Sequence, residues 1–412
     1  MKSPVLLDIS RLIWGAKRVG PTGIDRIELA YAQHVLAQQA SRPAYLVLHV
    51  SGLLFALSTT GGRRFVEDLA SRWRGSAPVQ KRGHLLAVVK TYWRLFTSVW
   101  IPGPWLRRKL RKHATAPIFL VVSHHHVGHG YTIRRIRRVF GAKAVCFIHD
   151  LIPIDYPEYC KPRTELRHHR AIANVGRIFE AAIVNSETTA QSLRSYLATM
   201  SGQTVSQLRI RVAMPGVRAF PVPDVATKTP DRPYFVMLAT IEPKKNHLLL
   251  LNLWTRLATS MAAPPQLLVI GSRGWDNEQV VDMLERSRRL RGLVFECRRM
   301  ADEDVGSALK GARALLVPSL AEGFGLPLAE ALASGVPAIC SDTPALREVG
   351  RDVPDFVDPL DLFGWRDAVL EYTEPHSKRR ADQMIRLAHW HAPNWAEHFE
   401  VVDRLLGDLD PC

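Results

Sequence analysis

Short apolar runs alternate with helix-forming stretches along most of the chain, and this alternation restricts the fold more than any other feature. In the first half, runs that predict buried strands lie at residues 5–9, 45–50, 118–123, 144–149 and 182–185. In the second half they lie at residues 234–239, 266–270, 293–296, 314–317 and 338–340. Strands that alternate with helices in this way form parallel sheets covered by helices, so the predicted fold class is α/β.

The length of 412 residues predicts two domains, because ordinary domains contain about 100–200 residues. A proline-containing stretch at residues 220–230 is typical of a linker. We therefore expect a Rossmann-like N-terminal domain over residues 1–222 and a second Rossmann-like domain over 223–390. A C-terminal helix within 391–412 is expected to pack back on the first domain. A ligand is expected in the cleft between the two domains, outside the carboxyl ends of the strands.

Positive charge is concentrated in the first half of the chain. The net charge is +16, and residues 1–225 contain 33 Lys and Arg against 12 Asp and Glu. The remainder contains 22 against 27, so the two halves carry +21 and −5. A basic surface favours nucleic acid, anionic lipid or a phosphorylated substrate. Zinc-finger spacings and aromatic RNA-binding runs are absent from the sequence, which disfavours nucleic acid. A merely solvated basic face remains the alternative.

A tryptophan-rich segment at residues 85–106 is followed by five basic residues at 107–112. Tryptophan rings settle at the level of lipid headgroups and basic side chains face anionic lipid, so this pattern is typical of an interfacial membrane helix. We therefore treat residues 81–113 as a membrane-facing segment of the first domain. A helical hairpin packed on the domain is the alternative. The sequence has no apparent signal peptide and five widely spaced cysteines, which predicts a cytoplasmic, peripherally membrane-bound protein with reduced thiols.

The segment Pro318–Pro337 carries the strongest chemical signal in the sequence. A predicted strand runs into the loop that contains Glu322, Gly323, Phe324, Gly325 and Leu326, and then into a helix that contains Glu330. Free N–H groups at the start of such a helix bind anions, and two carboxylates beside them accept hydrogen bonds from hydroxyl groups. This combination fits a nucleoside diphosphate sugar. An ordinary capped helix with two surface glutamates is the alternative.

The same segment resembles the E-x7-E element of retaining GT-B glycosyltransferases of glycosyltransferase family four, in which two Rossmann-like domains face each other across a cleft. Residues 238–247, which read Leu-Ala-Thr-Ile-Glu-Pro-Lys-Lys-Asn-His, resemble an element of bacterial polysaccharide mannosyltransferases. Weaker likenesses lie at residues 148–159, 184–190 and 269–275. The resemblance extends from about residue 140 to 350 and is most specific in the second domain.

The resemblance implies roles for particular residues. Glu330 would hold the donor ribose, Glu322 would contact the transferred sugar, and Lys245 would neutralise the leaving diphosphate. Many relatives carry an arginine where this chain has Thr240, and Lys244 is the expected substitute cation. His149, at the end of a predicted strand, would touch the donor sugar.

Four further residues are weaker candidates. Gly23, between the first predicted strand and helix, would allow close approach of the donor or acceptor. Asp25 and Arg26 are expected to contact the acceptor or simply to pair with each other on the helix. His125 belongs to a histidine cluster at 124–129 that is interpreted as contacting substrate rather than metal, because no carboxylate or cysteine follows at helical spacing.

The sequence therefore predicts a hexosyltransferase that uses a nucleoside diphosphate sugar and no metal. GDP-mannose is the preferred donor from the resemblance, although the nucleotide base is left open between guanine and uracil. The acceptor is expected to be a growing polysaccharide or a lipid-diphosphate-linked saccharide, and retention of configuration is implied by the resemblance. The alternatives are a GT-B nucleotide-sugar epimerase and a non-catalytic nucleotide-sugar-binding subunit of a membrane assembly.

Overall fold

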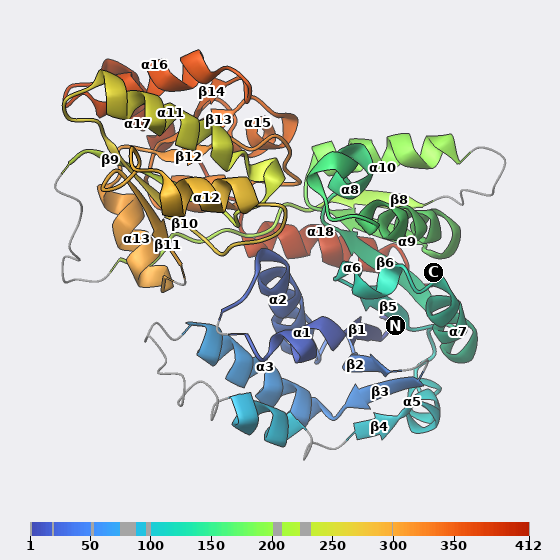
Figure 1. The fold of residues 1–412 in the computed structure, drawn as a ribbon. Helices are drawn as coiled ribbons and strands as arrows, with labels where there is room; N and C mark the ends of the chain where they lie inside the picture. The colour runs from blue at the N-terminus through green and yellow to red at the C-terminus, as the bar shows by residue number, and fades with distance from the viewer. Residues whose placement is uncertain are drawn as a thin grey trace. The chain divides into compact units, whose positions relative to one another are not determined.

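The structure, a computed structural model, describes residues 2–18, 20–50, 53–74, 88–95, 100–200, 208–222, 232–298 and 300–411. The chain divides into two compact units (Figure 1). Unit 1 contains residues 1–151, 166–215 and 395–412, and unit 2 contains residues 152–165 and 216–394. Each unit is built on a largely parallel sheet with helices, which confirms the predicted α/β class.

The sheet of unit 1 has the strand order β4-β3-β2-β1-β5-β6-β7-β8. Its strands are β1 (Val5–Asp8), β2 (Ala44–Val50), β3 (Leu53–Leu57), β4 (Trp100–Pro102), β5 (Ile118–Val121), β6 (Lys143–Ile148), β7 (Ala181–Val184) and β8 (Arg209–Val212). All neighbouring pairs are parallel except β2 with β3 and β3 with β4. The order reverses at β1, whose residue Val5 lies opposite Ala44 on one side and Ile118 on the other.

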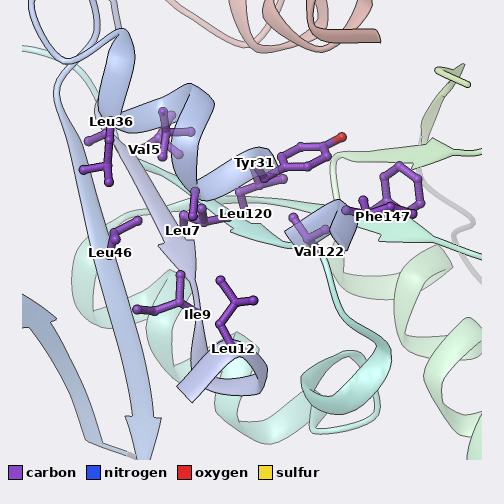
Figure 2. Packing of buried hydrophobic residues seen from close by; sticks show 14 of the residues in the cluster. Val5, Leu7, Ile9, Leu12, Tyr31, Leu36, Leu46, Leu120, Val122 and Phe147 are labelled. Carbon is purple, nitrogen blue, oxygen red and sulfur yellow. The ribbon is translucent and has the colours of Figure 1, made fainter. Parts of the chain in front are cut away.

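Helices cover this sheet and complete its core. They are α1 (Ser10–Gly15), α2 (Gly23–Ala37), α3 (Thr59–Arg74), α5 (Gly103–Leu110), α6 (His124–Val127), α7 (Gly130–Phe140), α9 (Thr164–Ile178), α10 (Glu187–Thr199) and α18 (Trp395–Gly407). Leu7, Tyr31 and Phe147 lie in one fully buried cluster (Figure 2). Phe399 and Leu406 of α18 belong to the same cluster, so the last helix of the chain is part of unit 1.

The sheet of unit 2 has the order β11-β10-β9-β12-β13-β14. Its strands are β9 (Tyr234–Leu238), β10 (Gln266–Ile270), β11 (Val294–Cys297), β12 (Leu315–Val317), β13 (Ala338–Ser341) and β14 (Asp355–Val357), all paired in parallel. In chain order this is the 3-2-1-4-5-6 arrangement of a doubly wound nucleotide-binding fold.

The helices of unit 2 are mostly connections between its strands. They are α8 (Ile152–Asp155), η1 (Pro157–Tyr159), η2 (Pro243–Lys245), α11 (His247–Ser260), α12 (Glu278–Arg286), α13 (Asp302–Gly311), α14 (Leu326–Ala333), α15 (Pro344–Gly350), α16 (Leu362–Thr373) and α17 (Lys378–Ala388). A fully buried core that includes Trp254 and Trp365 fills this unit.

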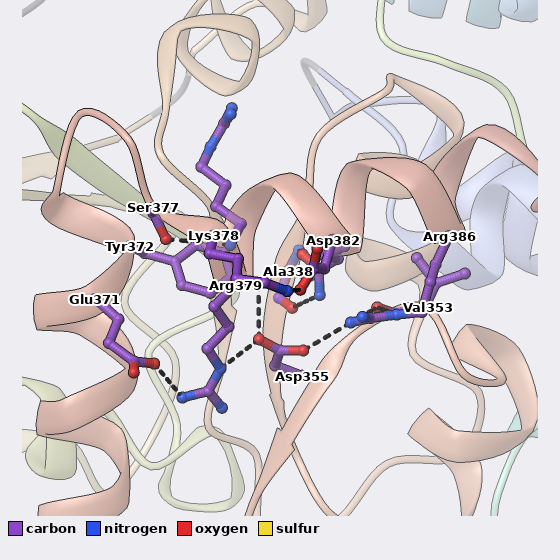
Figure 3. A network of polar contacts seen from close by, with 12 residues as sticks. Ala338, Val353, Asp355, Glu371, Tyr372, Ser377, Lys378, Arg379, Asp382 and Arg386 are labelled. Carbon is purple, nitrogen blue, oxygen red and sulfur yellow. Dashed lines mark hydrogen bonds and ion pairs between the residues drawn. The ribbon is translucent and has the colours of Figure 1, made fainter.

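A polar network fastens α16 and α17 to the edge strand β14. Asp355 accepts hydrogen bonds from Tyr372 at 2.8 Å, from Arg379 at 2.6 Å and from Arg386 at 2.7 Å (Figure 3). Arg379 also pairs with Glu371 at 2.9 Å. Because one carboxylate joins three side chains, the last helices of unit 2 are held in a fixed register against the sheet.

The tryptophan-rich segment differs from the interfacial helix predicted for it. Residues 88–95 are helical, but residues 100–102 form strand β4 and residues 103–110 form helix α5. Trp93 and Trp105 are 70% and 65% exposed, whereas Trp100 is partly buried and donates a hydrogen bond to the Leu95 carbonyl at 3.0 Å. The prediction of one helix over 85–106 is therefore wrong, because antiparallel pairing with β3 takes Trp100 into the sheet. Residues 81–87 and 96–99 lie outside the described residues.

A helix that crosses a bilayer needs about 20 mostly apolar residues. Within the described ranges, no helix combines the length and apolar character needed to cross a bilayer.

Candidate functional site

The candidate site of unit 2 lies between β9 and β12, where the order of the strands along the sheet reverses. The carboxyl ends of parallel strands meet at one edge of a sheet, and the loops that follow two adjacent strands are brought together there. The loop after β9 contains Lys244 and Lys245, and the loop after β12 contains Glu322. The backbone N–H of Leu320 donates to the carbonyl of Lys244 at 2.8 Å, which joins the two loops directly.

Lys245 and Glu322 form an ion pair in this position. The Lys245 Nζ lies 2.5 Å from the Glu322 Oε1, and the two side chains are only 12% and 8% exposed. The Ser319 hydroxyl donates to the same oxygen at 2.8 Å. Burial raises the pKa of the Glu322 carboxyl, but the Lys245 ammonium and the Ser319 hydroxyl outweigh burial, so that the net pKa is lowered. Glu322 is therefore an ionised hydrogen-bond acceptor at neutral pH.

The turn that carries Lys245 is fixed by its neighbour Asn246. Asn246 has a φ of +57°, a conformation that asparagine tolerates better than most residues, and it begins α11. Its side-chain amide donates to the Pro359 carbonyl at 2.9 Å. This local geometry explains why asparagine follows the lysine pair in the sequence.

The second predicted cation has a different environment. Lys244 Nζ lies 3.3 Å from the carboxylate of Glu242, which is buried at the start of η2. Thr240 is exposed, and Arg273, which forms an isolated parallel bridge with Ile241, is paired with Glu285 and Glu296 at 2.6 and 2.8 Å. The substitution of Lys244 for the arginine of many relatives remains a prediction.

Helix α14 begins as the sequence predicts, after a strand and a glycine-containing loop. Gly325 has a φ of +92°, and a Cβ atom there would lie 2.7 Å from Leu346 Cδ2, so glycine is required on two grounds. Phe324 is buried beside it, while Gly323 and Leu326 are partly exposed. Glu330 is the fifth residue of the helix and is half-buried. The binding roles of these residues remain predictions.

The remaining candidates all lie in unit 1. His149 follows β6 and is buried, with its Nε2 2.8 Å from the Val122 carbonyl. Burial lowers its pKa to about 4, so the imidazole is neutral at physiological pH. Gly23 is the first residue of α2, and the side chain of Thr22 caps that helix.

The three residues predicted to contact the acceptor have different environments in the structure. Asp25 is fully buried, completes the capping box of α2, and pairs with Arg11 at 2.9 Å and Arg18 at 2.6 Å. These contacts give Asp25 a structural role. Arg26 is half-buried on α2, and the backbone of His125 belongs to α6, while the side chain of His125 lies outside the described residues.

The structure singles out a different histidine of the 124–129 cluster. His126 Nδ1 is bonded to the buried carboxylate of Asp8, which also accepts from Ser10 Oγ at 2.5 Å. Burial lowers the pKa of His126, but the bond to Asp8 and its charge raise it by more, so the net pKa is raised. Asp8 ends β1 and His126 follows β5, so the pair lies at the switch point of the unit 1 sheet. The sequence signal for this pair is Asp8, a carboxylate at the end of an apolar strand, which the sequence-based prediction did not include.

A metal site requires several ligand side chains that converge on one point. Among the residues that the structure describes, no group of three or more His, Cys, Asp or Glu side chains is arranged to hold a metal ion.

Comparison with known proteins identifies a family match within unit 2. Residues 223–353 match the family "Glycosyl transferases group 1". The O-antigen chain mannosyltransferase B of Escherichia coli is 33% identical over 146 residues, which are 35% of this chain and 38% of that protein. The E. coli serotype-specific mannosyltransferase WbdA is 26% identical over 287 residues, 66% of this chain and 34% of that protein. The matches thus span little more than a third of each of these relatives.

Solved structures extend the likeness to the whole fold. Sucrose-phosphate synthase from Thermosynechococcus elongatus has a TM-score of 0.62 at 16% identity and covers 99% of both chains. Anabaena Alr3699/HepE in complex with UDP and glucose has a TM-score of 0.61 at 12% identity, with 98% of this chain and 100% of that chain covered. The fold is therefore that of GT-B glycosyltransferases, and residues 223–353 are a glycosyl transferases group 1 domain.

Proposed function

Because this chain contains a glycosyl transferases group 1 domain, we propose that it transfers a hexose from a nucleoside diphosphate sugar to a glycan. Mannose carried by GDP is the donor we favour, since the curated relatives named above are mannosyltransferases. The acceptor in this proposal is a growing polysaccharide or a lipid-diphosphate-linked saccharide. The observation that carries the proposal is the buried Lys245–Glu322 pair at the switch point of the unit 2 sheet.

The pair suits a substrate with adjacent phosphate and sugar groups. Without donor, the ammonium and the carboxylate neutralise each other at 2.5 Å. A diphosphate would compete for Lys245, and Glu322 would then be released to accept hydrogen bonds from sugar hydroxyls. The exchange replaces one charge-assisted contact with others, so neither group is left as an uncompensated buried charge.

Departure of the nucleoside diphosphate places negative charge on the bridging oxygen. Lys245 and the free N–H groups at the start of α14 would stabilise this charge, because they are fixed before the reaction begins. Glu330 would hold the ribose. We propose that transfer proceeds without a metal ion and with retention of configuration, so that the leaving phosphate accepts the proton of the attacking hydroxyl.

Unit 1 would supply groups that contact the acceptor and, at His149, the donor sugar. The Asp8–His126 pair holds an imidazole in a defined orientation at the switch point of that unit. His149 is a neutral imidazole at the end of the adjoining strand β6. We propose that these two histidines, with Gly23, Arg26 and His125, face substrate, whereas Asp25 maintains the start of α2.

A product assay tests the proposed reaction. The full chain is incubated with GDP-mannose, UDP-glucose and UDP-N-acetylglucosamine, with and without saccharide acceptors, and released nucleotide, epimerised donor and new glycan are separated. Transfer from one donor is expected in the wild-type chain, with the anomeric configuration of the product read by NMR. Glu322→Gln should reduce transfer about 100-fold or more, since it removes a charged contact that strengthens in the transition state.

Arg366→Gln is the control, because the partly exposed Arg366 lies in unit 2 far along the chain from the site and its described side-chain contacts are with Asp367 and the ring of Phe363. It should retain full transfer. Epimerised donor without glycan would instead establish the epimerase, and binding without turnover would establish the non-catalytic subunit. Unreduced transfer by Glu322→Gln would refute the assigned site.

We also propose that the chain binds the inner face of the cytoplasmic membrane peripherally. Trp93 and Trp105 are the exposed tryptophans of the basic segment and would lie at the headgroup level. Replacing both with Ser should reduce sedimentation with anionic liposomes at least fivefold while donor binding is unchanged. Trp100→Phe, at the partly buried tryptophan, should leave sedimentation as it is. Equal sedimentation of wild type and Trp93→Ser/Trp105→Ser would contradict this proposal.

A further inference from the structure

A cavity of about 450 Å³ lies in unit 1, remote in sequence from every residue placed in the donor site. It is formed by α5, α7 and strand β3. Ligand sites in proteins typically measure roughly 300–1,000 Å³, so the cavity is large enough for a small organic molecule.

Four arginines line this cavity: Arg107, Arg108, Arg111 and Arg135. Arg107 and Arg108 belong to α5, Arg111 is the C-cap residue of that helix, and Arg135 belongs to α7. No carboxylate lines the cavity, and none of the four has an acidic partner among the described residues. All four arginines are exposed and, among the described residues, carry positive charge around one cavity without an acidic partner, so an anion bound there would be attracted to them.

The rest of the lining is apolar. Leu53 and Leu54 come from β3, and Ile136, Val139 and Phe140 come from one face of α7. A basic surface with no role other than solvation does not require apolar side chains beside its arginines. A free nucleotide also fits poorly, because no lining carboxylate could accept hydrogen bonds from ribose hydroxyls.

We infer that this cavity binds a phosphate group attached to an apolar chain, as in a lipid phosphate. The arginines would form paired hydrogen bonds to the phosphate oxygens, and the apolar chain would lie on β3 and α7. The exposed Trp105 lies on the same helix as Arg107 and Arg108, next to the lining residue Pro104. The proposal concerns unit 1 alone and does not depend on the glycosyl transfer proposed above.

Titration of the full chain with three probes tests the site. The probes are inorganic phosphate, butyl phosphate and octyl phosphate, each below its aggregation concentration, followed by calorimetry. Octyl phosphate should bind at least tenfold more tightly than butyl phosphate, since each fully buried methylene contributes up to about fourfold. Inorganic phosphate should bind more weakly than either.

Two charge-matched variants identify the residues responsible. Arg108→Gln/Arg111→Gln/Arg135→Gln alters the cavity, whereas Lys112→Gln/Arg134→Gln/Arg138→Gln removes three exposed charges from α7 and the end of α5 that do not line it. The cavity variant should lose at least tenfold in octyl phosphate affinity, and the control should lose less than twofold. Both should melt like the wild type and bind nucleotide as the wild type does, so a failure here is separate from a failure of the donor site.

Vesicles separate a membrane lipid from a dispersed lipid phosphate. Flotation on phosphatidylglycerol vesicles that is lost in the cavity variant alone would identify a membrane headgroup as the source, whereas octyl phosphate binding without that loss would identify a dispersed lipid phosphate. The inference would be overturned by equal losses in both variants, by independence from chain length, or by no binding of octyl phosphate.

Discussion

At the scale of single residues, the site of unit 2 depends on a buried ion pair whose members belong to different loops. Lys245 and Glu322 are 77 residues apart in the chain and 2.5 Å apart in space. A pair as buried as this one contributes little net stability, because desolvation offsets the attraction, but losing one partner leaves a buried charge. This asymmetry makes the pair testable without knowing the substrate.

Replacing Lys245 with Met should destabilise the protein by about 3 kcal/mol at pH 8 and by clearly less at pH 5. In the wild type the folded-state pKa of Glu322 is lowered, so its contribution is present above the unfolded pKa and is lost as pH falls through the folded pKa. In the variant, burial is opposed only by the weaker effects of Lys244 and Ser319, so the pKa of Glu322 is higher than in the wild type and acid relieves the uncompensated charge. Urea unfolding at the two pH values measures the difference.

The double variant Lys245→Met/Glu322→Gln is the control, because it also removes the charge left behind. It should regain most of the stability at pH 8. A loss that is identical at both pH values, or a double variant no more stable than Lys245→Met, would show that the pair is not electrostatically coupled as described.

Sequence reasoning could find Glu322 and Lys245 because each follows an apolar strand within a recognisable element. It could not choose among the neighbouring histidines at 124–126. Their difference arises from Asp8, which lies 118 residues from His126 in the chain and is brought to it only by the pairing of β1 with β5. Similarly, the pairing of Asp25 with Arg11 and Arg18 depends on how α1 and α2 pack.

At the scale of elements, apolar runs located the central strands but missed β3, β4, β8 and β14. Three of these strands are short: β4 and β14 have three residues each and β8 has four. The same three strands lie at sheet edges, where exposed and buried positions alternate and no continuous apolar run is needed. The tryptophans of residues 85–106 suggested a helix because an edge strand and an amphipathic helix both present half-apolar patterns. Only the antiparallel pairing with β3 distinguishes them.

The start of α14 gives a prediction at this scale. Gly325→Ala should destabilise unit 2 by about 2–4 kcal/mol, since the backbone at this position is left-handed, which a Cβ atom disfavours, and the new methyl group meets Leu346. Gly335→Ala is the matched control, because Gly335 has a φ of +73° with no heavy atom within 4 Å of the added Cβ. It should cost only about 1 kcal/mol.

Chemical unfolding of both variants measures these free-energy costs, and nucleotide titration measures binding at the anion site proposed for the start of α14. Gly325→Ala should also weaken nucleotide binding more than Gly335→Ala does. Equal stability of the two variants would mean that the contact with Leu346 does not constrain the loop.

At the scale of the whole molecule, two units with separate cores predict separable unfolding. Leu406→Ala, in helix α18, should lower the stability of unit 1 by about 2–5 kcal/mol because it opens a cavity in a fully packed core. Leu257→Ala should do the same to unit 2. In calorimetry, each substitution is expected to shift a different transition. A common shift of one transition by both would contradict independent cores.

The central claim is that unit 2 binds a nucleoside diphosphate sugar through Lys245 and Glu322. Isothermal titration of the full chain with GDP, UDP, GDP-mannose and UDP-glucose tests it most directly. The account predicts saturable binding of one nucleotide and its sugar conjugate, weakened at least tenfold by Lys245→Met, with Glu322→Gln weakening only the sugar conjugate. Absence of heat with all four ligands, or affinities unchanged in Lys245→Met, would contradict it.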